Sequence, residues 1–330
     1  MTSKKTIFSG IQPSGNLHIG NYLGAVQQWL KFQNSGEYNN IFCIVDEHAI
    51  TIPQDPKILR KKIIEITLIY LASGIDPEKS LVFIQSHIPE HAELAWILNT
   101  ITPLGELQRM TQFKDKAKEK GLLAGLFNYP VLMAGDILLY DTDIVPVGED
   151  QIQHVEFTRM IAKKFNNQYG KTFKIPEVSI IKEGKRIMGL DDPKKKMSKS
   201  ASSTKNYIAI LDEPDIIRKK ISSAVTDSDN EIKFDEKNKP AISNLLNIYS
   251  LFSDADIKEL EKEYQSKDYS IFKKNLAEII INALKPIQDK YKELENNPSY
   301  VEKILKDGEI KAKEIACKKL SEIKQKIGFI

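Results

Sequence analysis

Short apolar runs alternate with amphipathic stretches over the first part of the chain. TIFSG at 6–10, IFCIV at 41–45 and LVFIQ at 81–85 are β-rich runs bounded by polar residues. The stretch KILRKKIIEITLIYLASG at 57–74 is helix-like, as is a run that starts near His18. This order of strands and helices is βαβ, which predicts a parallel sheet covered by helices on both faces.

A further strand is expected at IVPVG, residues 144–148, followed by a helix that starts near Glu149. In open α/β sheets, ligands commonly bind where a strand ends, a glycine follows and a helix begins. The segment TFKIPEVSIIKEGKRIMGL at 172–190 predicts another strand and a turn that lead into a lysine-rich loop.

Beyond about Tyr207 the pattern becomes helical. Apolar residues recur at helical spacing in NLAEIIINALKPIQDKYKEL, residues 275–294, and again at 315–327 among lysines and glutamates. We therefore expect an α/β domain at 1–205 and an all-helical domain at 206–330. The chain has no internal repeat of fixed period and no low-complexity linker, so we expect the two domains to pack together.

Composition narrows the class of protein. The chain has 330 residues, 41% of them hydrophobic and 28% charged, as is typical of globular proteins. MTSKKTIFSG lacks the apolar core of a secretory signal, and no stretch is apolar enough to cross a bilayer, so we expect a cytoplasmic protein without membrane contact. Cys43 and Cys317 are isolated in sequence, which disfavours a disulfide framework, a cysteine zinc site and an iron–sulfur cluster. The net charge of +3 is compatible with an anionic partner but does not require one.

The segment SGIQPSGNLHIGNYLG, residues 9–24, forms a glycine-rich strand-to-helix turn. His18 and Asn21 are three residues apart at the start of the helix, so both can face one phosphate at the positive end of the helix dipole. The segment matches neither a P-loop nor the dinucleotide-binding glycine pattern. Taken alone, the segment is better explained as a glycine-rich turn with a capping histidine.

A second segment, KMSKS at 196–200, has two lysines three residues apart, two serines and an apolar anchor in Met197. A solvated basic loop or a localisation-like cluster would explain the lysines if the segment stood alone. Together with PSGNLHIGN at 13–21, however, it resembles the two signatures of class I aminoacyl-tRNA synthetases.

The resemblance is strongest to the bacterial-type tryptophanyl-tRNA synthetases and covers essentially the whole chain. The segments that carry it are TIFSGIQPSG, FCIVDEHAIT, GELQRMTQFK, MAGDILLYDTDIVPVGEDQ, RIMGL, KKMSKS and KPAISNLLNIYS. It implies a Rossmann-like parallel-sheet catalytic domain at 1–205 with an inserted helical segment, and an α-helical domain at 206–330 that binds the tRNA anticodon. It also implies a homodimer that uses L-tryptophan, ATP with Mg²⁺ and tRNA(Trp), with no structural metal.

The resemblance assigns ATP contacts to residues in four segments. They are Gln12, Pro13, Ser14, Gly20, Asn21, Gly148, Glu149, Asp150, Ile187, Lys196, Met197, Ser198, Lys199 and Ser200. Glu149 or Asp150, at a strand end, can also accept hydrogen bonds from ribose hydroxyls. The alternative is that these acidic residues only stabilise the N-terminus of the following helix through its dipole. Lys114 resembles a family lysine that reaches ATP phosphate, and a surface lysine is the alternative.

Asp136 interrupts the apolar stretch YPVLMAGDILLY at 129–140. A buried carboxylate needs donors, and an indole ring needs an apolar slot plus one acceptor for its N–H. Asp136 beside Met133 and Tyr129 could supply both, and the matching aspartate is the specificity residue in the tryptophan enzymes. Hydrogen bonding within the domain, or solvent exposure, remains the alternative. In the DEH segment at 46–48, we interpret His48 as a positioning residue.

The implied reaction joins tryptophan to adenylate and then to tRNA. Because the attacking carboxylate is already ionised, no strong base is needed, and we expect catalysis by positioning and charge from Lys196, Lys199 and His18. Three alternatives stay open: a tyrosyl-tRNA synthetase, a non-catalytic paralogue that binds tRNA or tryptophan, and a small-molecule adenylyltransferase.

Overall fold

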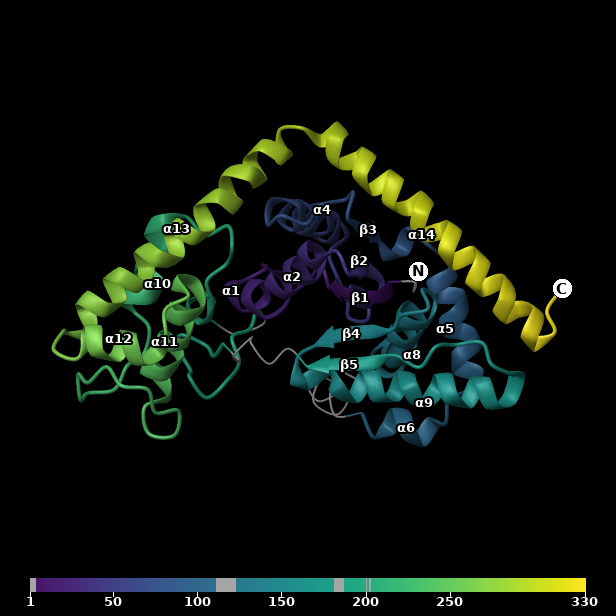
Figure 1. Ribbon diagram of the computed structural model, residues 1–330, viewed down its shortest axis with the longest axis horizontal. Helices are drawn as coiled ribbons and strands as arrows, with labels where there is room; N and C mark the ends of the chain where they lie inside the picture. The colour runs from purple at the N-terminus through teal and green to yellow at the C-terminus, as the bar shows by residue number, and fades with distance from the viewer. Residues whose placement is uncertain (1–3, 111–122, 181–186, 200, 202) are drawn as a thin grey trace. The chain divides into compact units, whose positions relative to one another are not determined.

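The computed structural model describes residues 4–110, 123–180, 187–199, 201 and 203–330 (Figure 1). By contacts between residues, the chain divides into two compact units. Unit 1 contains 1–14, 29–181 and 297–330, and unit 2 contains 15–28 and 182–296.

Unit 1 is built on a five-stranded parallel sheet with the strand order β3-β2-β1-β4-β5. The strands are β1 (Lys5–Ile11), β2 (Tyr38–Ile44), β3 (Ser80–Ile84), β4 (Ile144–Val147) and β5 (Glu177–Ile180). All four β-rich runs named in the sequence form strands, and the 172–190 segment supplies the fifth. The α/β fold class is therefore confirmed.

The strand order reverses at β1. From β1 the chain first builds outward through β2 and β3, and it later returns to the other side of β1 with β4, where Ile7 pairs with Ile144. Such a reversal is the topological switch point of an open α/β sheet, and ligands bind outside the carboxyl ends of the strands there. The segments that follow β1 and β4 are thus the first places to look for a nucleotide site.

Helices cover the sheet of unit 1. They are α2 (Gln27–Ser35), which begins just before the unit boundary, α3 (Asp46–Ala49), α4 (Pro56–Ala72), η2 (Gln85–His87), α5 (Glu90–Ile101), α6 (Leu104–Gln108), α8 (Ala124–Leu138), η3 (Glu149–Gln151), α9 (Ile152–Tyr169) and α14 (Pro298–Ile327). Local sequence sets several ends: Asp55 accepts hydrogen bonds from the main-chain N–H groups of Lys57 and Ile58 at 2.8 and 3.0 Å and caps α4. Proline at the first position starts both α4 and α14.

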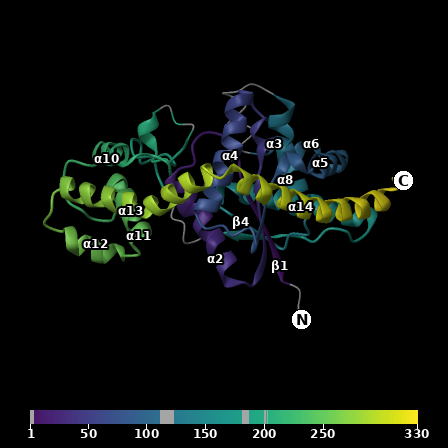
Figure 2. The same ribbon diagram turned by 90° about the horizontal axis from the view of Figure 1, so that it is seen from above.

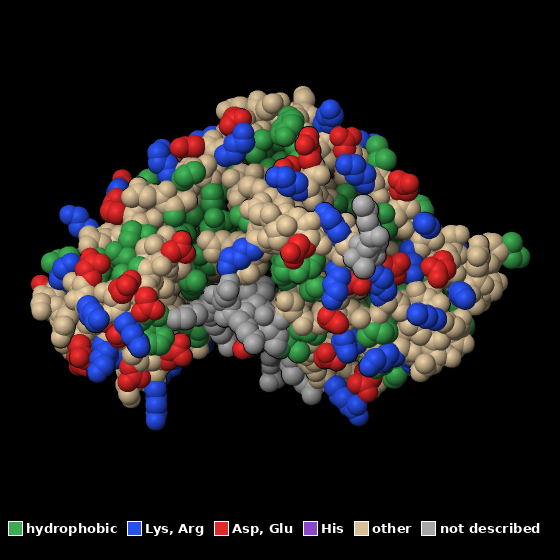
Figure 3. Space-filling model, in the orientation of Figure 1, with side chains coloured by type: hydrophobic (Ala, Val, Ile, Leu, Met, Phe, Trp, Pro, Cys, Tyr) green, Lys and Arg blue, Asp and Glu red, His purple; other side chains and the backbone are tan. Residues whose placement is uncertain are grey.

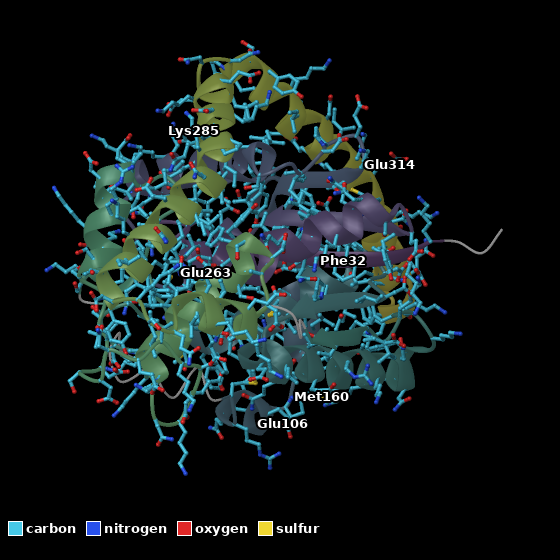
Figure 4. All side chains as sticks on the ribbon, turned by 60° about the vertical axis from the view of Figure 1, so that its left-hand side comes forward. Phe32, Glu106, Met160, Glu263, Lys285 and Glu314 are labelled. Carbon is cyan, nitrogen blue, oxygen red and sulfur yellow. The ribbon has the colours of Figure 1, made fainter. Side chains whose placement is uncertain are left out.

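The C-terminal helix α14 belongs to unit 1 by packing. It lies against β3 and α5, and four of its apolar residues share one core cluster with the sheet. These residues are Ala312, Ala316, Leu320 and Ile323. Figures 1 and 2 show α14 as a long helix beside α5, and Phe32 on α2, Met160 on α9 and Glu314 on α14 locate three helices of this unit in Figure 4.

Unit 2 is helical apart from its loops and isolated bridges. Its elements are α1 (Ile19–Asn21), η1 (Tyr22–Val26), η4 (Thr204–Asn206), α10 (Pro214–Ser222), α11 (Pro240–Ser253), α12 (Ile257–Tyr264) and α13 (Tyr269–Glu295). Buried Tyr249, Tyr264 and Phe272 pack ring to ring between α11, α12 and α13. Glu263 on α12 and Lys285 on α13 mark this unit in Figure 4.

The described residues from 206 onward form helices and no strand, as the sequence predicted. The contact-defined units are interleaved along the chain, whereas the predicted division is a single cut between residues 205 and 206. The division of binding functions between 1–205 and 206–330 stays a prediction. Among the described helices, none is both long and apolar enough to span a membrane.

Gly308 lets α14 approach the sheet. A Cβ at this position would overlap the main-chain oxygen of Val82 on β3. Overpacking of this kind typically costs 1–3 kcal/mol. We expect Gly308→Ala to lower the free energy of unfolding by about 1–3 kcal/mol, measured by urea denaturation.

Gly24 provides a matched control, because a Cβ there would meet no heavy atom within 4 Å. Gly24→Ala should leave the stability unchanged or raise it by up to about 1 kcal/mol, as alanine favours helix. Equal effects of the two substitutions would contradict this account of α14 packing.

Candidate active site

Two predicted ATP segments lie at the switch point of the sheet in unit 1. Residues 12–14 directly follow β1, and 148–150 directly follow β4. The Gln12 side chain donates to the main-chain oxygen of His48, and Ser14 N–H donates to Gln12 O at 2.8 Å. Gly148, Glu149 and Asp150 are exposed, and Gln151 Nε2 donates to Asp150 Oδ2 at 3.0 Å. Both segments therefore sit at the edge where nucleotides bind in such sheets.

Gly10 makes the end of β1 possible. A Cβ there would lie 2.7 Å from Cys43 O and 2.9 Å from Val45 Cγ1 of the neighbouring strand and its extension. Any side chain would push β1 away from β2, and the 12–14 turn would move with it. The glycine thus fixes the turn through close approach of the two chains.

Asp136 lies at the centre of a buried polar cluster in unit 1, hereafter the Asp136 cluster: Asp136, His48, Gln85 and His91. Gln85 Nε2 and His91 Nδ1 lie 2.7 and 2.6 Å from Asp136 Oδ1, and His48 Nε2 lies 2.7 Å from Oδ2. Asp136 is 1% exposed, and Gln85 and His91 are fully buried. The in-domain bonding considered for Asp136 is therefore present, and the carboxylate is buried as well.

The hydrogen bonds of the cluster fix its protonation. An ionised carboxylate only accepts, so both histidines donate to it. His91 Nδ1 donates to Asp136, and His91 Nε2 lies 2.8 Å from the Tyr140 hydroxyl. Burial alone would raise the pKa of Asp136, but the charge of His48 and the bonds from His48 and His91 hold it well below its ordinary value. Asp136 is accordingly ionised at neutral pH.

The Asp136 carboxylate retains capacity for one more donor. A carboxylate offers about four lone-pair sites. The three contacts described above occupy two sites on Oδ1 and one on Oδ2. Oδ2 therefore keeps an acceptor site on the side of His48, which is the chemistry an indole N–H requires. Nearby on α8, the Tyr129 hydroxyl lies 2.7 Å from His154 Nε2 of α9.

The HIGN turn, residues 18–21, lies in unit 2. His18 precedes α1, and its main-chain N–H donates to Asn21 Oδ1 at 3.2 Å. Ile19 N–H donates to Ile208 O at 3.0 Å, which ties the turn to the 207–210 segment. A Cβ on Gly20 would lie 3.0 Å from His18 Nδ1 and 3.7 Å from Ile187 Cβ, so this glycine makes room for the imidazole. Ile187 is buried beside it.

The described part of the KMSKS segment lies in the same unit. Lys196 forms an antiparallel bridge with Met188, and Met197 N–H donates to Ile187 O at 3.0 Å. The Met197 side chain is buried, so it anchors the loop as its position among charged residues suggested. The Lys199 stem lies against Gly15, where a Cβ would be 3.0 Å from Lys199 Cδ and where φ is +63°.

Lys196, Lys199 and His18 act on one another electrostatically. His18 is 4% exposed. Burial, followed by the charges of Lys199 and Lys196, lowers the pKa of His18 to about 3. At neutral pH the imidazole is therefore uncharged and offers a hydrogen bond, and the two lysines supply the positive charge. This combination suits a phosphate chain.

Sequence reasoning missed several residues of these two regions. Gln85 and His91 were not named, although both bond directly to Asp136. Asn206 was also missed. Its Oδ1 accepts a hydrogen bond from Ser198 N–H at 2.9 Å, and its Nδ2 donates to Asp191 Oδ1 at 2.5 Å. These two bonds stabilise the lysine loop. A pattern of polar residues at strand ends could have indicated Gln85. Ser200 and Lys114 lie outside the described residues.

Comparison with known proteins identifies the family. Residues 2–285 match the family described as tRNA synthetases class I (W and Y). The chain belongs to this family. The resemblance stated from the HIGN and KMSKS segments is confirmed. Residues 18–21 and the described residues 196–199 of these segments lie in unit 2.

Individual relatives are similar over nearly their full length. The tryptophan–tRNA ligase of Clostridium tetani is 54% identical over 330 residues, which cover 99% of this chain and 97% of that protein. Tryptophanyl-tRNA synthetase from Mycoplasma pneumoniae has a TM-score of 0.92 at 36% identity, with 99% of each chain covered. The synthetase from Campylobacter jejuni complexed with ADP and tryptophan has a TM-score of 0.84 at 42% identity, with 98% of this chain and 100% of that chain covered.

The lowered pKa of His18 predicts a pH dependence of stability for this synthetase. An unfolded histidine has a pKa near 6.5, so between pH 6.5 and about 3 the unfolded chain binds one more proton at this site. Stability is therefore lost as pH falls through this window, by at most about 1.4 kcal/mol per pH unit. His18→Gln lacks this contribution.

Urea unfolding of both proteins at pH 7, 6 and 5 measures the effect. The free energy of unfolding of the wild type, relative to His18→Gln, should fall from pH 6 to pH 5 by about 1 kcal/mol. Parallel pH curves for the two proteins would show that His18 titrates normally in the folded chain.

Proposed function

We propose that this chain is a tryptophan–tRNA ligase, which activates L-tryptophan with ATP and transfers it to tRNA(Trp). The observation that carries the proposal is the end-to-end similarity to tryptophan–tRNA ligases at 54% identity. The neutral histidine beside two lysines in unit 2 and the ionised, buried Asp136 in unit 1 support the two halves of the chemistry, phosphate binding and indole recognition.

In the first step, a tryptophan carboxylate oxygen bonds to the α-phosphorus of ATP. The bond from that phosphorus to the bridging oxygen breaks, and pyrophosphate leaves with the electron pair. In the second step, the terminal ribose hydroxyl of the tRNA bonds to the carbonyl carbon, AMP leaves, and the hydroxyl loses its proton. Because the first nucleophile is already an anion, positioning and charge stabilisation are the main requirements of that step.

Lys196 and Lys199 are the charged groups that stabilise the transferring phosphoryl group. His18 is neutral at the working pH and donates a hydrogen bond to the phosphates, while Asn21 orders the turn that carries His18. Ser198 and Ser200 add neutral donors. Mg²⁺ enters with ATP as part of the substrate and neutralises phosphate charge, and no protein-held structural metal is part of the proposal.

In unit 1, the carboxyl edge of the sheet is assigned to ATP contacts. Gln12, Pro13 and Ser14 supply main-chain and side-chain polar groups, and Gly148, Glu149 and Asp150 supply acceptors for the ribose hydroxyls. Their positions after β1 and β4 support this assignment. Gly20 and Ile187 are assigned to the base and ribose contacts, and Met197 holds the lysine loop by its buried side chain.

Asp136 accepts the indole N–H of tryptophan. The spare acceptor site on Oδ2 supports this role, as does the fixed orientation that Gln85 and His91 give the carboxylate. A ligand with a phenol in place of the indole leaves this ionised acceptor unpaired, which is costly in a buried site. The same cluster therefore favours tryptophan over tyrosine.

The tRNA contacts and the cellular location complete the proposal. We assign the tRNA anticodon to the helical region 206–330, where lysines are frequent, although Figure 3 shows basic and acidic side chains interspersed over its visible face. An unchanged salt dependence of tRNA binding after lysine-to-alanine changes on α13 would contradict this assignment. The protein is assigned to the cytoplasm, without membrane contact.

We assign a homodimer to this chain. Trp96 on α5 is 69% exposed and Leu104 on α6 is 61% exposed, which is unusual for large apolar side chains and typical of an interface. A monomeric mass in sedimentation equilibrium would contradict the assignment.

Pyrophosphate exchange into ATP tests the function directly. The wild type should catalyse exchange with tryptophan and not with tyrosine. Lys199→Ala should lower the exchange rate by about 100-fold or more with little change in tryptophan affinity, because a group engaged in the transition state contributes to rate. Exchange with tyrosine alone would identify the tyrosine enzyme, and no exchange with any amino acid would indicate a non-catalytic paralogue.

Lys194→Ala is the matched control, because Lys194 lies in the same loop and is exposed. Its exchange rate should stay within about threefold of wild type, since a solvated charge contributes little. A normal rate for Lys199→Ala would contradict the catalytic assignment of the lysine.

A further inference from the structure

A cavity lies in unit 1, and Asp136 is not among its lining residues. Its volume is about 510 Å³, and it lies between α4, α14 and the end of β3. Its apolar lining residues are Pro56, Leu59, Ile63, Ile64, Ile84 and Leu305. Figures 1 and 2 both show α14 running past α4. Size and apolar lining are those of sites for small organic molecules.

One buried carboxylate lines this cavity. Asp46 is 7% exposed, and its two oxygens accept hydrogen bonds from Ser86 N–H at 2.9 Å and Ser86 Oγ at 2.5 Å. Within the described residues, no lysine, arginine or histidine forms an ion pair with it. Three basic residues also line the cavity. His87 and Lys306 contact Glu309 at 3.5 and 2.8 Å, and Arg60 is exposed to solvent. Asp46 is therefore a buried charge held only by neutral donors.

A buried carboxylate of this kind is most stabilised by a cation that brings its own apolar body. An ammonium group would neutralise Asp46 and fill its remaining acceptor sites, and a compact apolar group would cover the isoleucine and leucine side chains. A carboxylate ligand would be repelled by Asp46, and an alcohol would donate a hydrogen bond without neutralising the charge.

We propose that the cavity between α4 and α14 binds compact apolar primary amines through Asp46, and that its occupancy weakens tryptophan binding. The second half rests on the proposed function, and the first half does not. Binding at this cavity is thus a property of the chain that can be measured without ATP, tryptophan or tRNA.

The connection to tryptophan runs through two short segments that the cavity and the Asp136 cluster share. In the 46–48 segment, Asp46 lines the cavity and His48 bonds to Asp136. In the 85–87 segment, Ser86 and His87 line the cavity and Gln85 bonds to Asp136. The two segments are tied by Glu47 N–H, which donates to Gln85 Oε1 at 3.1 Å.

An ammonium ion at the remaining acceptor sites of Asp46 draws the carboxylate toward the cavity and weakens its bonds to Ser86. Loosening of the bond between Ser86 and Asp46 frees the 85–87 turn, and with it the Gln85 side chain that orients Asp136. An Asp136 carboxylate that is less well oriented is a poorer acceptor for an indole N–H. The amine should therefore raise the dissociation constant of tryptophan.

Binding is tested by isothermal titration calorimetry of the full chain with three probes of one shape: cyclohexylmethylamine, cyclohexylmethanol and cyclohexanecarboxylate. The amine should bind about tenfold more tightly than the alcohol, and the carboxylate should not bind detectably. Asp46→Asn keeps the shape and should abolish the advantage of the amine. Ile63→Phe, which fills the cavity, should weaken the binding of the amine and of the alcohol to the same extent.

Glu78→Gln is the matched control, because Glu78 is an exposed acid of the same unit outside the cavity lining. It should leave the binding of the amine unchanged. Absence of amine binding to the wild type, or equal binding to wild type, Asp46→Asn and Ile63→Phe, would overturn the cavity site.

Coupling is tested by titrating tryptophan at increasing amine concentration. The apparent dissociation constant should rise by about fivefold and then reach a plateau, as expected for two separate sites. A rise without limit would mean that the amine occupies the tryptophan site itself, which would overturn the proposal. No rise at saturating amine would overturn its second half. Failure of the proposed function would appear differently, as tryptophan that does not bind even without amine.

Discussion

The carboxylate of Asp136 is the interaction on which the rest of unit 1 depends. A charge that is 1% exposed is stable only when donors surround it, and here they come from Gln85, His91 and His48. These donors lie after β3, on α5 and after β2, while Asp136 itself is on α8. One buried charge thus ties together the carboxyl edge of the sheet and the helices that the chain inserts between β3 and β4.

The Asp136 cluster also shows which parts of the candidate site could be predicted from the sequence. Asp136 stands out in sequence because it interrupts an apolar run, and a buried site was predicted for it with solvent exposure as an alternative. Its partners were not, apart from a positioning role for His48, because Gln85 and His91 are 51 and 45 residues away and only the parallel sheet brings them together. Local patterns specify strands and helices, whereas the choice of hydrogen-bond partners depends on packing between distant elements.

In the helical part of the chain, local patterns likewise predicted the elements but not their packing. The periodicity of 275–294 correctly predicted α13, and the lysine-rich end correctly predicted α14. Periodicity does not say which core a helix joins, however. Gly308 and the alanines at 312 and 316 give α14 a narrow face that fits closely on β3 and α5, so it belongs to the unit that contains the sheet. Small residues in a lysine-rich helix were the sequence feature that could have indicated this packing.

The residues proposed to bind phosphate meet a different constraint, because they must provide positive charge without a buried, unpaired charge. The structure keeps His18 neutral by burial and leaves the positive charge on Lys196 and Lys199, whose loop is held by Met197 and Asn206. The two signatures were predicted to act together because of their resemblance to one family. The two signatures are also linked physically, because the charges of Lys199 and Lys196 add to burial in lowering the pKa of His18.

In the proposed function, the remaining acceptor site on Asp136 Oδ2 accepts the indole N–H of tryptophan. It is tested by the affinities of tryptophan and of 3-benzothienylalanine, in which sulfur replaces the N–H, for the wild type and Asp136→Asn. In the variant, Gln85 and His91 hold the amide oxygen, so the amide NH₂ faces the indole and repels its N–H. The wild type should prefer tryptophan by about tenfold to a hundredfold, and the variant should lose that preference. Equal preference in both proteins would contradict the claim.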